Sequence, residues 1–143
     1  MKKYTVLKYL VLLLLFTGFA FAQSHGLYAL MYNIQRVCKA YQIDVSMKDI
    51  RVEKDFEDNL VLILKLDARR TNYNSTMMTG FYAVAKAMRM TPNNPEIDKV
   101  SLEIIVEDRE SNVIFSTVAL EDLALLENGS ITPTEFRKRI ESM

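Results

Sequence analysis

Leucines occupy every second position between Leu60 and Leu66. The segment Lys99–Glu107 alternates in the same way, with apolar side chains at Val100, Leu102, Ile104 and Val106. Since successive side chains of a strand point to opposite faces of a sheet, this period of two predicts two strands with one buried face each. Such strands need a second layer of apolar residues to cover them.

Two amphipathic helices are predicted to supply that layer. The segment Ser24–Gln42 places apolar side chains at helical spacing: Leu27, Leu30, Met31, Ile34, Val37, Cys38 and Tyr41. A second helix is expected to begin near Asn74 or Ser75, which can cap it, and to end at about Met90, before Pro92. Its apolar stripe consists of Met77, Met78, Phe81, Val84, Ala85 and Met88.

Two strands are predicted after each helix. The first pair is Asp49–Phe56 and Asn59–Ala68, and the second is Lys99–Glu107 and Asn112–Val118, turned by Asp108–Asn112. We therefore predict an α+β fold: two helix-strand-strand units that form a four-stranded antiparallel sheet with two helices on one face, plus a C-terminal helical hairpin. The order of elements resembles that of small envelope modules such as the BON domain.

The segment Asn128–Phe136, NGSITPTEF, contains residue types of a calcium-binding EF-hand loop. If Gly129 held the sixth position and Glu135 the twelfth, Ala124 and Leu126 would hold the first and third. Neither side chain can ligate calcium, which needs about six oxygen ligands. No calcium site is therefore predicted.

Helix capping explains the same residues. The segment Leu120–Glu127 is predicted to be helical, and Gly129 lies where a left-handed C-terminal cap is needed. Thr132 is expected to cap the next helix, with Pro133 at its first position and Glu135 completing a capping box. The tail is therefore predicted to form a helix-turn-helix corner.

The stretch Leu123–Ile140, LALLENGSITPTEFRKRI, resembles the short C-terminal, or SHOCT, module of bacterial proteins. In that module a Leu-rich helix, Gly-x-Ile-Thr and Glu-Phe precede a basic helix. The resemblance covers less than about a fifth of the chain. It implies a helical hairpin used for association, with no catalytic residue.

The N-terminus has the parts of a secretory signal peptide. Lys2 and Lys3 precede the apolar run Tyr9–Ala22, which ends in the cleavage signal Ala20-Phe21-Ala22. We expect a periplasmic or secreted protein without a stable membrane anchor after cleavage; an uncleaved anchor is the alternative. The predicted division is a signal peptide at 1–22, an α+β domain at 23–118, and a C-terminal helical hairpin at 119–143 that packs on the domain or extends from it.

Charge and cysteine content restrict the classes of function. The predicted leader carries three of the 18 basic residues, so the mature chain would have 15 against 18 acidic residues, a net charge near −3. That balance argues against a nucleic-acid partner, since nucleic-acid-binding domains are usually basic. Cys38 is the only cysteine, so the chain forms no intramolecular disulfide and depends on apolar burial.

No catalytic residue, cofactor or metal site is predicted. His25, the only histidine, lies close to the predicted mature N-terminus, a poor place for a catalytic triad. Cys38 falls within an apolar helix stripe and is expected to be a buried structural thiol. Methionines are ligands for copper(I), but those of the second helix are expected to fill the core: Met77, Met78, Met88 and Met90.

The second face of the predicted sheet carries the candidate partner-binding residues. These are the apolar residues expected to point away from the helices: Val61, Ile63, Ile105, Ile114 and Val118. Exposed apolar clusters usually mark partner sites. The alternative, that the C-terminal hairpin folds over them, stays open.

From this pattern we predict an exported, non-enzymatic protein-interaction module. It would be a subunit or accessory factor of an envelope or secreted assembly. Its partner would be another envelope or secreted protein or a second copy of itself. The alternative is a carrier that holds a small apolar ligand between the sheet and the Met-rich helix.

Overall fold

The computed structural model describes residues 25–107 and 111–143. The predicted signal peptide and residues 108–110 of the predicted turn lie outside the described residues. An N-terminal helix covers residues 25–40. It is followed by η1 (Met47–Asp49), β1 (Ile50–Lys54), β2 (Leu60–Arg69), α2 (Tyr73–Met90), β3 (Lys99–Glu107), β4 (Asn112–Ala119), α3 (Leu120–Glu127), α4 (Pro133–Arg137) and β5 (Glu141–Ser142).

The fold is α+β, but its sheet differs from the predicted one in two respects. It has five strands in the order β1-β2-β3-β4-β5, and β2 pairs with β3 in parallel while the other pairs are antiparallel. The sheet is therefore mixed, because α2 connects β2 to β3 and runs back along the sheet. An 18-residue helix is about 27 Å long, enough to return most of the roughly 33 Å that a ten-residue strand covers.

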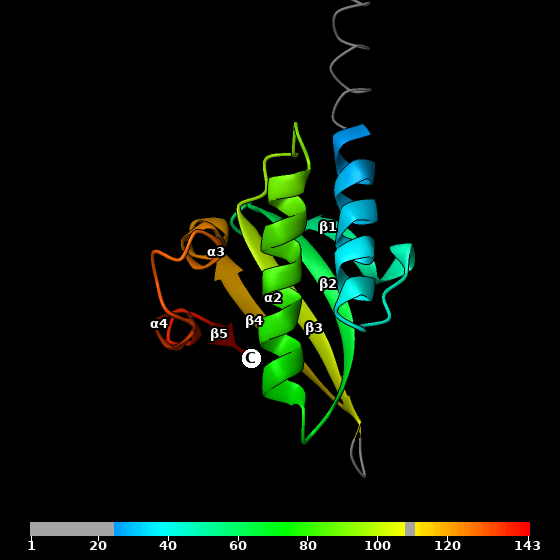
Figure 1. The fold of residues 1–143 in the computed structure, drawn as a ribbon, viewed down its shortest axis with the longest axis vertical. Helices are drawn as coiled ribbons and strands as arrows, with labels where there is room; N and C mark the ends of the chain where they lie inside the picture. Colours follow the sequence, from blue (N-terminus) through cyan, green and yellow to red (C-terminus); the bar gives the residue numbers. More distant parts are fainter. Residues whose placement is uncertain (1–24, 108–110) are drawn as a thin grey trace, which may run out of the picture.

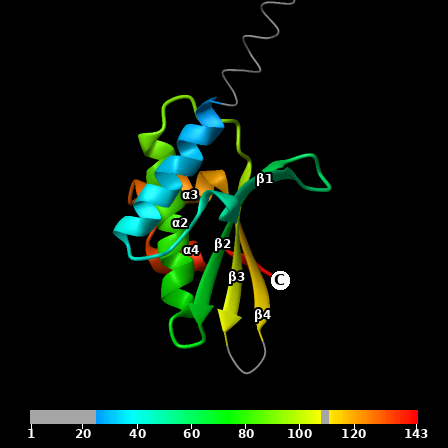
Figure 2. The ribbon, with the colours of Figure 1, turned by 90° about the vertical axis from the view of Figure 1, so that its right-hand side faces the viewer.

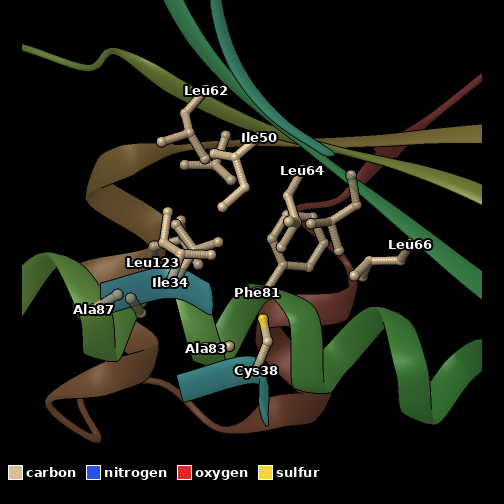
Figure 3. Packing of buried hydrophobic residues seen from close by; sticks show 14 of the residues in the cluster. Ile34, Cys38, Ile50, Leu62, Leu64, Leu66, Phe81, Ala83, Ala87 and Leu123 are labelled. Atoms are coloured by element: carbon tan, nitrogen blue, oxygen red, sulfur yellow. The ribbon is translucent and has the colours of Figure 1, made fainter. Parts of the chain in front are cut away.

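The helices lie on one side of the sheet (Figures 1 and 2). The alternating residues of β2 and β3 face them and are fully buried, including Leu64 and Leu102. Figure 3 shows Leu62, Leu64 and Leu66 pointing from β2 toward the helix layer. The alternating apolar side chains of the strands and the apolar stripes of the helices therefore pack together in one core. Phe81 of α2 is fully buried in it.

The C-terminal tail joins the same core. Leu123 of α3 and Phe136 of α4 are buried in it, and the Phe136 ring packs edge-on against Phe81 at 5.5 Å between centroids. The tail differs from the predicted hairpin in its last step, because after α4 the chain adds β5 to the edge of β4. Backbone hydrogen bonds exchanged by Phe115 and Met143, at 3.1 and 3.0 Å, hold that edge.

The local capping predictions for the tail are confirmed. Gly129 has a φ of 76°, and the N–H of Ser130 donates to the carbonyl of Leu125 at 2.9 Å, as in a Schellman cap. The Thr132 backbone N–H donates to the Glu135 carboxylate at 2.7 Å, and the Glu135 N–H donates to the Thr132 hydroxyl at 3.2 Å.

Among the described residues, no helix is both long and apolar enough to cross a membrane.

Candidate functional site

The face of the sheet turned away from the helices, here called the open face, is not covered by the described helices (Figure 2). The tail does not fold over it, since Leu123 and Phe136 pack in the core on the opposite side. Strand register places these residues on the open face: Arg51, Glu53, Val61, Ile63, Lys65, Asp67, Arg69, Lys99, Ser101, Glu103, Ile105, Glu107, Val113, Phe115, Thr117 and Glu141.

The predicted partner-binding residues divide between the two faces. Val61, Ile63 and Ile105 lie on the open face, where Val61 is buried and the other two are half-buried. Ile114 and Val118 do not: they are paired with Ile104 and Val100 and face the core. Their predicted placement was wrong because β4 alternates in step with β3, whose even-numbered residues are buried.

The structure instead brings Val113 and Phe115 of β4 to the open face, with exposed fractions of 49% and 37%. Sequence reasoning missed them because the core-facing side of β4 contains Ser116, which obscures the apolar stripe. Ser116 is fully buried and lies 3.3 Å from the hydroxyl of Tyr73 and 3.4 Å from that of Ser142. A buried polar residue with such partners is compatible with a core position.

A groove of about 460 Å³ crosses one end of the open face. Its floor is formed by neighbouring strands: Val61 and Ile63 of β2, Ser101 of β3 and Thr117 of β4. The hydroxyls of Ser101 and Thr117 lie 2.9 Å apart and satisfy each other. The floor is therefore half apolar and half neutral-polar.

The groove lies between the β1–β2 hairpin and β5. In Figure 2 the hairpin projects from the sheet on the side opposite the helices, and the C-terminus lies on that same side. Phe56 at the hairpin tip is fully exposed, and Met143 beside β5 is 91% exposed. Two large apolar side chains thus lie at opposite ends of the groove, exposed to solvent and not packed against the core.

Charged side chains surround the groove in clusters with more acids than bases. The Lys99 ammonium lies 3.0 Å from the Asp55 carboxylate and 3.2 Å from that of Glu57. The Arg51 guanidinium lies 2.7 Å from carboxylate oxygens of both Glu53 and Glu103. Each cation is therefore shared by two carboxylates.

Asp55 organises the hairpin that forms one wall of the groove. Its carboxylate accepts hydrogen bonds at 2.9 Å from the backbone N–H groups of Glu57 and Asn59, and one at 3.0 Å from the Asn59 side-chain amide. These bonds, led by that from the Asn59 side chain, and the Lys99 ammonium hold the pKa of Asp55 well below its usual range. The carboxylate therefore stays ionised at ordinary pH and keeps its place at the groove.

The residues considered for metal chemistry do not gather into a site. Within the described residues, no group of three or more histidine, cysteine and acidic side chains is placed to hold a metal ion. Glu135 is engaged by its capping box, and the Asn128 side-chain oxygen accepts a hydrogen bond from the Ser130 N–H at 2.8 Å. Of the α2 methionines, Met77 and Met88 are buried in the core, whereas Met90 is exposed.

Cys38 lies fully buried in the core, and its burial raises the pKa of the thiol to about 11. The ordinary value is 9.0, so at pH 8 the thiolate population is about a hundredfold smaller than that of a free thiol.

We expect alkylation of Cys38 by iodoacetamide at pH 8 to be at least about a hundredfold slower in the native protein than in urea. Mass spectrometry over time measures both rates. A native rate within about tenfold of the unfolded rate would show that the thiol is accessible.

The open face is thus a surface of apolar and charged side chains, with an excess of acids around the groove and without a recognisable catalytic arrangement in the described part of the chain. Most of its charged groups pair with one another. No protein-family model, curated protein or solved structure matches the chain.

Proposed function

We propose that this protein is an exported, non-enzymatic interaction module that binds a protein partner through the open face. The observation that carries the proposal is the exposure of Val113 and Phe115 on the open face and of Phe56 and Met143 at its groove. Large apolar side chains grouped on one surface usually mark a partner site. Aromatic residues at such places commonly supply much of the binding energy.

The tail is a weaker candidate for the binding surface. A helical hairpin used for association would present its apolar side chains to a partner, but Leu123 and Phe136 are buried in the protein's own core. The exposed residues of α4 are mostly polar, including Arg137. We therefore assign partner binding to the open face and an architectural role to the tail.

The partner would be another envelope or secreted protein, or a second copy of this one. Export rests on the basic, apolar and A-x-A parts of residues 1–22. A module of this kind would serve as a subunit or accessory factor of an envelope or secreted assembly. Recovery of a native N-terminus at Gln23 by mass spectrometry would support the export step.

The carrier alternative has less support. It requires space for a ligand between α2 and the sheet, but the helix lies so close that a Cβ on Gly80 would come within 2.6 Å of Leu66 Cδ1. The side chains at this interface, such as Phe81 and Leu102, are fully buried. A ligand there would have to displace well-packed core residues, which costs free energy.

Site-specific photo-crosslinking tests the proposal. A photoreactive phenylalanine is placed at Phe56 or Val113, and the protein is irradiated in the cells that produce it. We expect discrete crosslinked species from both positions, because a bound partner would lie against these exposed side chains. Gel mobility and mass spectrometry identify the species.

The same probe at Tyr28 or Tyr82 is the matched control. Both are exposed aromatic residues of helices, and their exposed fractions of 67% and 38% lie on either side of that of Val113, so they report random collisions. The proposed function is wrong if the helix-layer positions crosslink as strongly as the open-face positions, or if Phe56 and Val113 give no discrete species.

A further inference from the structure

We infer that the groove of the open face binds a basic, apolar polypeptide segment: one with a large apolar side chain flanked by lysines or arginines. This inference rests on the proposed function and names the chemistry of the partner. It follows from the charges around the groove and from the position of its apolar side chains.

The charges at the groove end of the open face are unbalanced. Six carboxylates lie there against three cations: Glu53, Asp55, Glu57, Asp58, Glu103 and Glu141 against Arg51, Lys54 and Lys99. Glu141 forms no ion pair with any described residue, while Lys54 is neutralised by Asp58 at 2.6 Å. The other four carboxylates share Arg51 and Lys99, so the groove end keeps an excess of three negative charges, which cations from outside can neutralise.

The acidic excess is local. Farther along the open face the numbers are equal, with Lys65 and Arg69 against Asp67 and Glu107; in the register Arg69 lies opposite Glu107, and Lys65 lies opposite Glu103. A positively charged segment would thus be attracted to the groove end in preference to the rest of the face. Such complementarity usually determines partner choice and association rate more than total affinity.

Apolar contacts would supply the remaining affinity. Phe56 and Met143 stand exposed at the two ends of the groove, and Val61 and Ile63 lie on its floor. A large apolar side chain between them would remove apolar surface from water on both molecules. The flanking cations of the same segment would then reach Glu57 on the hairpin and Glu141 on β5.

A second copy of the protein fits this groove less well. In a two-fold symmetric dimer the same surface of each copy meets its equivalent. Glu57 and Glu141 of one copy would then approach the acidic groove of the other, and like charges brought together oppose association. The acidic groove therefore favours a basic segment of a different protein.

Three labelled peptides test the inference in fluorescence-polarisation titrations. They share a Phe-Leu centre that is flanked on each side by two lysines, two glutamates or two serines. We expect the lysine peptide to bind most tightly, and to lose affinity as salt is raised, because exposed ion pairs are screened. The Glu57→Gln/Glu141→Gln double variant should weaken its binding about fivefold or more.

The Glu96→Gln/Glu121→Gln double variant is the matched control, because it removes the same charge at exposed positions outside the groove. Its affinity should be unchanged. Phe56→Ser, which alters an exposed side chain, should also weaken binding of the lysine peptide.

Several outcomes would overturn the inference. These are equal binding of the three peptides, no binding of any, equal effects of the two double variants, and dimerisation through the open face in sedimentation experiments. The proposed function fails separately, when open-face positions do not crosslink to a partner in cells. The three peptides could also bind equally well to the wild type but more weakly to Phe56→Ser. That result would reject the charge preference while supporting the open face as the binding surface.

Discussion

Replacing Phe136 with alanine is expected to lower the free energy of unfolding by about 3–5 kcal/mol, the usual cost of removing a buried phenylalanine. The side chain is fully buried although it belongs to a helix of only five residues. Its ring packs edge-on against Phe81 of α2, with 5.5 Å between the centroids. The variant would leave a cavity between α4 and α2 and would lose this aromatic contact.

Phe56→Ala is the matched control, because it removes the same atoms from a fully exposed position. Its effect should be below about 0.5 kcal/mol. Urea denaturation monitored by circular dichroism gives both values. Equal stabilities of the two variants would mean that the tail is not part of the cooperative core. Packing of the tail in the core would then no longer explain why the tail leaves the open face uncovered.

Elements with a clear local pattern could be predicted from the sequence. The second strand was expected at Asn59–Ala68 and lies at Leu60–Arg69, and the expected strand Lys99–Glu107 has those same bounds. The second helix ends at Met90, as expected, although it begins at Tyr73, slightly before the predicted caps. These patterns succeed because each element buries one face, which leaves a period in the sequence.

Pairing between distant strands could not be predicted in this way. The parallel pairing of β2 with β3 depends on the path of α2, and a side-chain period is the same in parallel and antiparallel strands. With two residues, β5 is too short to have a period at all. Its place at the sheet edge is fixed by pairing with β4, through Phe115 and Met143.

The candidate site was predicted only in part for the same reason. Val61, Ile63 and Ile105 were placed on the correct face because their strands have a clear buried side. In β4 both sides contain apolar residues, so its orientation is decided by register with β3. The exposed Phe56 belongs to a turn, where no period indicates which way a side chain points.

Replacing Gly80 with valine is expected to destabilise the protein by about 3 kcal/mol, since overpacking a core usually costs about 1–3 kcal/mol and occasionally more. Gly80 lies where α2 packs against Leu66 of β2 and Leu102 of β3. An added Cβ would meet Leu66 Cδ1 at 2.6 Å and Leu102 Cδ1 at 3.1 Å, and both leucines are buried. Gly80→Ala should be much milder, because its helix propensity, about 1 kcal/mol better than that of glycine, offsets part of the clash.

The control is the same pair of residues at Tyr82, an exposed position of α2. The difference between Tyr82→Ala and Tyr82→Val reports helix propensity alone, about 0.5 kcal/mol. The Ala–Val difference at Gly80 should exceed it severalfold in thermal or urea unfolding. If the two differences are equal, space exists between α2 and the sheet. A carrier of a small apolar ligand requires that space, so this result would favour the carrier over the interaction module.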